Sequence, residues 1–361
     1  MIDYRRRRGT LLEQVKADGF VVLNSEDSDA ASLYYLTGFS GEGALLIRDG
    51  KEELVTDSRY TEQAEREAPD LLLHEAKGGY LEALADALRG TPTRRVAFSS
   101  RRMTYYTAEK ARSLFDGVEV VPLEDPVSAL RLVKGEEEAA AIREATRLAE
   151  EALTEEVDHV RVGMTEREIA LRLEIGMRER GADGVSFDLI VAAGANSSLP
   201  HYRPGGVHLK KGDLLLFDIG ARYRGYCSDL TRTVSVGRPP AWAVEVYELV
   251  RRANRAGVAA IRAGVTGKEA DAAAREVIVA GGHGERFGHG LGHGVGLEVH
   301  EGPRLSPLST DSLAVGMVTS VEPGVYLPGR GGVRIEDLVL VKAAGCEVLT
   351  SFPHERLLEV G

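Results

Sequence analysis

The sequence predicts two domains: a smaller N-terminal α/β domain and a larger C-terminal α+β domain whose two halves share one plan. The chain has 361 residues, which is enough for two domains that each have a core. Short apolar segments alternate with helical segments over the first 121 residues, a pattern typical of α/β folds. Beyond residue 160, related segments recur at a separation of about one hundred residues, which indicates an internal repeat.

The domain boundary is expected within residues 122–138, which contain Pro122, Pro126 and the acidic run Glu136-Glu137-Glu138. Carboxylates favour the start of a helix, because the helix dipole is positive there. A long helix is therefore expected from this run to about Val160. We expect an N-terminal domain at residues 1–125 and a C-terminal domain at residues 126–361.

In the N-terminal domain, the clearest local signal is Asp49-Gly50, a dipeptide typical of tight hairpin turns. It lies between two strand-like segments that are expected to pair, residues 44–47 and 53–57. A helix is expected from about residue 9 to Asp18-Gly19, and the arginine run before it is expected to be a solvated helix start. The other expected elements are strands at 20–23, 96–98 and 118–121, and helices from 60 and over 80–88.

Composition and charge exclude several classes of protein. The formal net charge of −11 argues against a nucleic-acid binder that relies on a basic surface. Two cysteines are too few for a disulfide framework, which fits a reducing cytoplasm. No apolar stretch approaches eighteen residues, and the basic start lacks the apolar run of a signal peptide. We expect a cytoplasmic protein that contacts neither nucleic acid nor membrane.

The internal repeat matches two pairs of segments. Residues 163–168 resemble residues 264–269, and each contains a Thr-x-x-Glu capping box that opens a helix. Residues 212–220 resemble residues 316–324: a glycine precedes an apolar strand, and a carboxylate, Asp218 or Glu322, follows six residues after that glycine. Two halves that each end a strand in a carboxylate are expected to meet around a shared acidic centre.

Histidine and glycine are concentrated in residues 287–301. This segment contains His289, His293 and His300 together with five glycines. Imidazole is a common metal ligand and the usual proton carrier at neutral pH, and glycine lets the backbone turn or approach another group closely. With acidic partners elsewhere in the chain, the segment predicts a functional site.

Two further carboxylates are expected beside this segment. Asp218 ends one strand and Asp229 begins the next, and a turn centred on Tyr223-Arg224 would place the two directly opposite each other. The two carboxylates of such a pair repel each other unless a cation lies between them. In residues 333–340, period-two alternation puts Arg334 and Glu336 on one face and turns Asp337 away as a structural residue.

Together with Glu322 and His293, these residues give four carboxylates and one imidazole. Hard oxygen ligands with a single nitrogen suit Mn²⁺ or Co²⁺, and Zn²⁺ or Fe²⁺ also fit. The count favours two ions over one, because shared carboxylates can bridge two ions about 3.5–4 Å apart with a bridging water as nucleophile.

The pattern resembles the metallopeptidases of the aminopeptidase P, prolidase and methionine aminopeptidase family, which has the pita-bread fold. The resemblance covers nearly the whole chain, and the N-terminal part is similar to the creatinase-type domain of the proline-specific branch. The motifs that support it are Tyr35–Phe39, Leu54–Tyr60, Phe217–Gly220, Tyr226–Thr233, Gly292–Glu301, Val321–Tyr326 and Arg334–Asp337.

The resemblance implies a role for each candidate residue. The metal ligands would be Asp218, Asp229, His293, Glu322 and Glu336, with Asp229 and Glu336 as the bridging pair. His300 would contact the substrate carbonyl or the tetrahedral intermediate, and Glu322 would transfer the proton. Further active-site residues would be His201 and His289, which flank the reaction centre, and Arg334 near the metals.

The resemblance also implies hydrolysis of the Xaa-Pro bond in a small peptide with proline second, by a homodimer. Arg304 lies in a Pro-Arg pair after His300-Glu301, where a prolidase arginine can bind the free carboxylate of a dipeptide. We therefore favour a dipeptidase over an aminopeptidase acting on longer peptides. A surface arginine without a role is the alternative for Arg304.

Three other classes share the fold or the ligands. Creatinase hydrolyses a non-peptide substrate without the metal set, and the five intact ligands count against it. The same argument disfavours a non-catalytic peptide-binding relative. Methionine aminopeptidase has the ligands but lacks a domain like residues 1–121.

Overall fold

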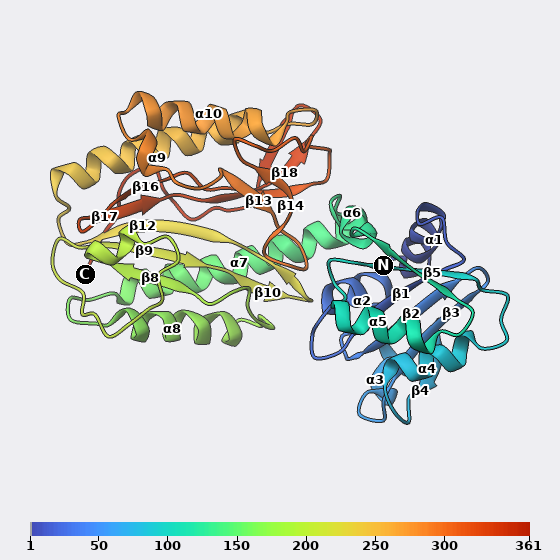
Figure 1. Cartoon of the computed structure of the whole chain (residues 1–361). Coiled ribbons are helices and arrows are strands. Elements are labelled where there is room, and N and C mark those ends of the chain that lie inside the picture. Colours follow the sequence, from blue (N-terminus) through green and yellow to red (C-terminus); the bar gives the residue numbers. More distant parts are fainter. Residues whose placement is uncertain (1) are drawn as a thin grey trace. The chain divides into compact units, whose positions relative to one another are not determined.

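The computed structural model describes residues 2–361, which form two compact units that divide between Arg131 and Leu132 (Figure 1). The division falls six residues after the expected boundary at 125. The reason is helix α6 (Pro126–Arg131), which packs on α1 (Tyr4–Gln14) and α2 (Ala30–Thr37) and so belongs to the first unit.

The first unit contains a six-stranded mixed sheet of order β4-β3-β2-β1-β5-β6. The hairpin expected at Asp49-Gly50 is confirmed, since β2 and β3 pair in antiparallel fashion on either side of it. The strands are β1 (Gly19–Asn24), β2 (Gly43–Arg48), β3 (Lys51–Thr56), β4 (Leu72–Glu75), β5 (Arg95–Ser99) and β6 (Glu119–Leu123). The remaining helices are α3 (Thr61–Glu67), α4 (Tyr80–Leu88) and α5 (Tyr105–Leu114).

The arginine run at the start of the chain is not simply solvated, and the helix expected from residue 9 begins at Tyr4. Asp3 caps it by accepting a hydrogen bond from the backbone N–H of Arg6 at 2.9 Å. The whole run therefore lies inside α1, which turns Arg8 inward. Its guanidinium is fully buried and forms ion pairs with Glu52, at 2.7 Å, and with Asp70.

The second unit is built from two halves, each with a pair of helices and a sheet. In Figure 1 the helix pairs α7/α8 and α9/α10 lie on opposite sides of this unit with the strands between them. The helices are α7 (Glu136–His159), α8 (Glu166–Glu179), α9 (Ala241–Ala260) and α10 (Gly267–Ala280). Both predicted capping boxes are confirmed, at Thr165 with Glu168 and at Thr266 with Glu269.

The sheets of the second unit carry the strands from which the site is built. The first half has the order β20-β12-β9-β8, with a small sheet β11-β10-β7 beside it. The second half has the order β14-β13-β15-β18-β19 and the hairpin β16-β17. The strands are β7 (Gly184–Val185), β8 (Ile190–Ala193), β9 (Leu214–Ile219), β10 (Ala221–Tyr223), β11 (Tyr226–Cys227), β12 (Leu230–Val236), β13 (Gly292–Gly294), β14 (Glu301–Leu305), β15 (Val318–Val321), β16 (Gly324–Leu327), β17 (Gly331–Arg334), β18 (Asp337–Lys342), β19 (Gly345–Val348) and β20 (Glu359–Val360).

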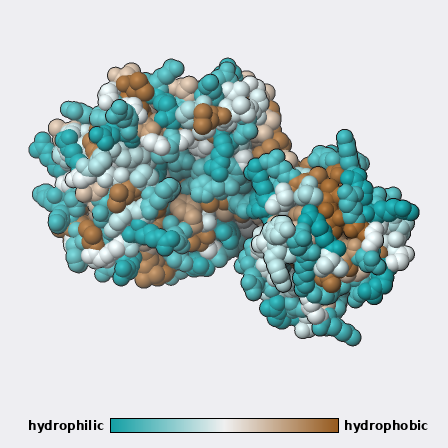
Figure 2. Space-filling model, in the orientation of Figure 1, coloured by the Kyte–Doolittle hydropathy of each residue, from teal (hydrophilic) through white to brown (hydrophobic). Residues whose placement is uncertain are grey.

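The surface of each unit is mainly polar, with apolar residues in scattered patches on the face that Figure 2 shows. Among residues 2–361, no helix combines the length and the apolar character that crossing a membrane requires.

The first unit contains a buried carboxylate whose ionisation is opposed by its surroundings. Asp29 caps α2 and is 4 % exposed. Burial raises the pKa of this carboxyl to about 7, although its hydrogen bond with Ser32 and the charge of Arg102 act in the opposite direction. Because the pKa in the folded state exceeds the unfolded value of about 3.9, the folded state binds the proton more tightly.

We therefore expect the stability of the protein to fall as the pH rises from about 4 to about 7, at up to about 1.4 kcal/mol per pH unit from this group. Asp29→Asn keeps the cap and removes the charge. The Tm of Asp29→Asn should match that of the unaltered protein near pH 4.5 and exceed it at pH 8 in scanning calorimetry. An equal difference at both pH values would show that Asp29 ionises normally.

Candidate metal centre

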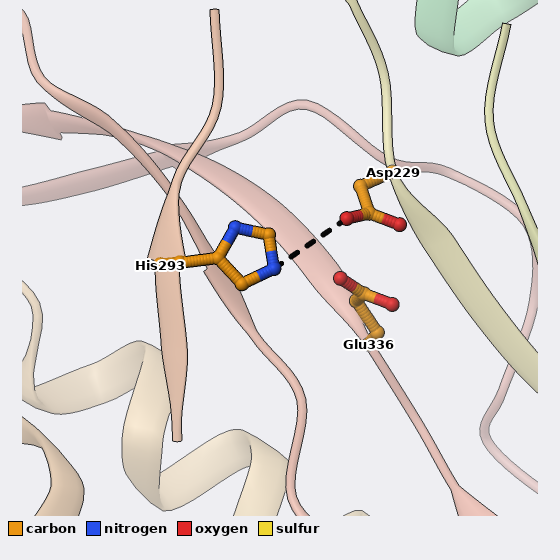
Figure 3. Close-up of side chains that lie close together, drawn as sticks. All are labelled: Asp229, His293 and Glu336. Atoms are coloured by element: carbon orange, nitrogen blue, oxygen red, sulfur yellow. Dashed lines mark ion pairs between the residues drawn. The ribbon is translucent and has the colours of Figure 1, made fainter. Parts of the chain in front are cut away.

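Three buried side chains from three separate segments converge in the second unit. Asp229 precedes β12, His293 lies in β13, and Glu336 lies between β17 and β18. Each offers a ligand atom within 4.8 Å of the others. Figure 3 shows these side chains pointing toward one another, with His293 Nε2 3.6 Å from Asp229 Oδ2.

The other two predicted ligands border the same cavity, whose volume is about 820 Å³. Glu322 directly follows β15, and its Oε1 is 3.3 Å from His293 Nε2. Asp218 lies near the end of β9, and its Oδ2 accepts a hydrogen bond of 2.5 Å from Arg334 Nη2. The structure thus brings all five predicted residues together.

The expected pairing of Asp218 directly opposite Asp229 is wrong. Strand β9 pairs with β12 in a register that places Thr231 opposite Asp218. The turn is centred one residue later than expected, between Arg224 and Gly225, because Arg224 adopts a left-handed conformation (φ 48°) and Gly225 follows at φ 76°. Asp218 and Asp229 still share a face, since residues two apart on a strand point the same way.

The backbone around His293 determines which ring nitrogen faces the carboxylates. His293 Nδ1 is 3.1 Å from the carbonyl oxygen of Gly294, which makes Nδ1 the donor and leaves Nε2 free to bind a cation. Gly294 must be glycine here, because a Cβ would lie 1.8 Å from the Gly302 carbonyl oxygen. The flanking glycines therefore allow the tight packing that fixes His293.

The electrostatics of the cluster fit a bound cation. Burial, together with the charges of the neighbouring carboxylates, raises the pKa values of Asp229 and Glu336 well above the usual range. Glu336 Oε1 is buried and makes no hydrogen bond within residues 2–361. A buried carboxylate oxygen without a donor is costly unless a cation binds it, so these residues suit a divalent metal.

A hydrogen-bonded chain supports the cluster from one side. Thr231 Oγ1 donates to Glu336 Oε2 at 2.6 Å and accepts from Arg334 Nε at 3.0 Å. Arg334 also donates to the hydroxyl of Tyr326 at 2.9 Å, which is 2.9 Å from His289 Nε2. Of the predicted residues, Arg334 thus contacts the cluster directly at Asp218 and indirectly through Thr231, and His289 is linked to Arg334 by Tyr326.

Sequence reasoning did not identify Thr231 and Tyr326. For Thr231 a signal was available, because it lies two residues after Asp229 and therefore on the same face of the strand. Tyr326 gave no comparable signal, since its contact with Arg334 depends on the β16-β17 hairpin.

The remaining predicted site residues line the same cavity. The His300 ring lies with its centroid 4.3 Å from that of His293, and burial, with the charges of His293 and Arg304, lowers the pKa of His300 to about 4. His201 is exposed and lines the same cavity. Arg304 stands opposite His293 in the β13–β14 pairing, and its guanidinium forms no hydrogen bond or ion pair within residues 2–361.

Asp337 is turned away from the cluster, as the alternation predicts. It pairs with Arg232 at 2.8 Å and accepts a hydrogen bond from Thr350 at 2.7 Å, both in the protein interior. These contacts hold Asp337 in the protein interior, away from the metal cluster.

Comparison with known proteins identifies the family. Residues 140–343 match metallopeptidase family M24, and residues 5–133 match the creatinase/prolidase N-terminal domain. The chain belongs to metallopeptidase family M24. The predicted architecture is thereby confirmed: an M24 pita-bread domain follows a creatinase-type N-terminal domain.

This M24 metallopeptidase is similar over most of its length to several proteins. It is 41 % identical to an uncharacterised peptidase of Bacillus subtilis over 96 % of this chain and 98 % of the relative. It is 36 % identical to the Xaa-Pro dipeptidase of Pyrococcus furiosus over 90 % and 92 % of the two chains.

Two solved structures have the same fold. The X-Pro aminopeptidase from Thermotoga maritima superposes with a TM-score of 0.91 at 41 % identity, covering 96 % of this chain and 99 % of that one. The Xaa-Pro dipeptidase from Bacillus anthracis superposes with a TM-score of 0.94 at 37 % identity, covering 99 % and 100 %.

The crowded carboxylates predict a trade between stability and metal binding. Glu336→Gln removes one buried charge and keeps an oxygen that can accept the Thr231 hydrogen bond. Without metal, we expect this variant to be more stable than the unaltered protein by about 1–2 kcal/mol at pH 8. It should lose most of the metal-induced stabilisation, which is about 2.7 kcal/mol at a free metal concentration of 100 Kd.

Thermal unfolding with a chelator and with added Mn²⁺ measures both effects. Asp188→Asn is the matched control, because its side chain lies on the wall of the same cavity but is 85 % exposed. A Glu336→Gln variant that gains as much from Mn²⁺ as the unaltered protein would contradict a role for Glu336 in metal binding.

Proposed function

We propose that this metallopeptidase is a dinuclear Xaa-Pro dipeptidase that releases the N-terminal residue from peptides with proline second. Relatives named Xaa-Pro dipeptidase and one structure named X-Pro aminopeptidase support the bond specificity. The names do not agree on peptide length. The observation that favours a dipeptidase is the unpaired guanidinium of Arg304 on the cavity wall.

Five residues would hold the metal ions: Asp218, Asp229, His293, Glu322 and Glu336. The family resemblance implies that Asp229 and Glu336 would be the pair shared by two ions. Mn²⁺ and Co²⁺ suit this set best, and Zn²⁺ or Fe²⁺ also fit it. Bound divalent ions supply Lewis acidity and lower the pKa of water to near neutral.

The side chains around the cluster would handle the substrate and the protons. Glu322 accepts a proton from the attacking water and returns it to the proline nitrogen, which must be protonated to leave as a secondary amine. His300 is neutral at pH 7, because its pKa is lowered to about 4, and so donates a hydrogen bond to the carbonyl oxygen as negative charge develops there. His201 lines the cavity near His300 and helps to hold the substrate.

His289 and Arg334 would act as positioning residues. His289 is hydrogen bonded to Tyr326, Tyr326 to Arg334, and Arg334 to Asp218. Burial raises the pKa of Asp218, and the positive charge of Arg334 acts in the opposite direction by favouring the ionised form.

Arg304 would limit the substrate to two residues. A dipeptide ends in a carboxylate directly after proline, and a planar guanidinium can bind it with two parallel hydrogen bonds. A longer peptide has an uncharged amide at that point. We further propose that the protein is a homodimer, as the family resemblance implies. A cytoplasmic location fits its two free cysteines, which form no disulfide.

Chelation followed by reloading tests the proposed reaction. We expect no cleavage after chelation, recovery with Mn²⁺ or Co²⁺, and a higher kcat/KM for Ala-Pro than for Ala-Pro-Ala. A higher value for the tripeptide would identify an aminopeptidase. A metal-loaded protein that binds both peptides and cleaves neither would be the non-catalytic relative.

Arg304→Ala tests the carboxylate site. Losing a charge-assisted hydrogen bond should raise KM for Ala-Pro about 10- to 100-fold and leave Ala-Pro-Ala nearly unchanged. Arg203→Ala is the matched control, because Arg203 lines the same cavity but lies 3.7 Å from Asp188. An unchanged KM for Ala-Pro in Arg304→Ala would show that Arg304 does not bind the substrate carboxylate.

A further inference from the structure

A buried carboxylate outside the metal cluster holds one wall of the cavity. Glu166 is the first residue of α8 and is 0 % exposed. Its Oε1 accepts hydrogen bonds from the Ala193 backbone at 2.8 Å and from Asn196 Nδ2 at 2.9 Å. Its Oε2 accepts hydrogen bonds from the Tyr202 hydroxyl at 2.7 Å and the Gly205 backbone at 3.1 Å.

All four donors belong to one segment, residues 193–205. This segment leaves β8 and carries Pro200, His201, Tyr202 and Arg203, which line the cavity. The contacts lie before and after His201 in the sequence, so one carboxylate group fixes both ends of this wall. Among residues 2–361, no Lys, Arg or His forms an ion pair with Glu166, so these donors and the N-terminus of α8 compensate its buried charge.

Helix capping does not explain Glu166. The capping box of α8 uses Glu168, which is exposed and accepts from Thr165 at 2.7 Å. In the second half of the repeat, the position after the capping threonine is Gly267, where a Cβ would lie 2.0 Å from the Arg304 carbonyl oxygen. Both halves of the repeat thus have the capping box. Only the first half has a carboxylate directly after the capping threonine, and that carboxylate binds the segment that carries His201.

We infer that Glu166 is a positioning residue that fixes the His201 wall of the cavity and thereby sets the affinity for substrate. This inference rests on the proposed function for its kinetic consequence, and on contacts alone for its structural one. Glu166 makes no contact with the metal cluster in the described residues, so its effect should appear in substrate binding and not in metal binding.

The test replaces the carboxylate by an amide of the same shape. In Glu166→Gln one oxygen becomes an N–H₂ donor that faces two donors of the wall, so the segment must shift. With the Mn²⁺-loaded enzyme and Ala-Pro, we expect KM to rise roughly tenfold, kcat to change less, and the Kd for Mn²⁺ in titration calorimetry to stay at the original value.

Glu168→Gln is the matched control. It removes a carboxylate from the same helix turn and weakens the cap, so it should lower Tm without changing KM. Equal changes of KM in Glu166→Gln and Glu168→Gln would overturn the inference, as would an unchanged KM in Glu166→Gln. A tenfold weaker binding of Mn²⁺ by Glu166→Gln would also overturn it.

Hydrogen–deuterium exchange provides a readout that is independent of the reaction. Exchange should accelerate in residues 193–205 of Glu166→Gln and stay unchanged there in Glu168→Gln. If the unaltered enzyme cleaves no Xaa-Pro peptide, the proposed function fails, and the exchange data still decide whether Glu166 holds the wall.

Asn196→Ala is a milder second variant for the case in which Glu166→Gln does not fold. Asn196 donates to both Glu166 and the Tyr202 hydroxyl and does not line the cavity. We expect about a threefold rise in KM with faster exchange in the same segment. Unchanged exchange and unchanged KM in Asn196→Ala would count against the inference.

Discussion

The main electrostatic constraint in the second unit is the mutual repulsion of carboxylates that are held away from water. Asp229 and Glu336 are almost fully buried, and Asp218 and Glu322 lie next to them. Within residues 2–361, Arg334 forms an ion pair with Asp218 and its charge also favours the ionised forms of Asp229 and Glu336. Holding these groups together without a bound ion costs free energy, and the same crowding favours the binding of cations.

The precision of the cluster comes from backbone contacts as much as from the ligands. The glycine next to His293 lets β14 approach until the imidazole has one orientation, and Thr231 commits one oxygen of Glu336 and leaves the other free. Backbone packing thus orients His293, and one hydroxyl group orients Glu336.

Sequence patterns were sufficient where the cause is local. The capping boxes at Thr165 and Thr266, the Asp49-Gly50 hairpin, and the face shared by Arg334 and Glu336 depend on neighbours within a few residues. The register of β9 against β12 depended on which residues adopt left-handed conformations at the turn, and the expected centre was one residue early. Arg8 was misjudged because its burial depends on Glu52 and Asp70, more than forty residues away.

The family-based expectations about ligands did not depend on strand register, because a motif specifies which residues occur and in what order. A motif does not specify the hydrogen bonds that hold those residues in place. Thr231, Tyr326 and Glu166 are ordinary residues in ordinary patterns, and only their partners in space distinguish them. The face of Thr231 could be predicted from its spacing to Asp229, but the hydrogen-bond partners of all three residues could not.

The division of the ligands between the two halves has a consequence for biosynthesis. Asp218 and Asp229 belong to the first half, and His293, Glu322 and Glu336 belong to the second. Glu336 is synthesised 107 residues after Asp229, so a nascent chain exposes its aspartates long before the proposed ligand set is complete. On the proposed ligand set, a nascent chain that ends before Glu336 lacks one of the two shared carboxylates and could not yet hold both ions.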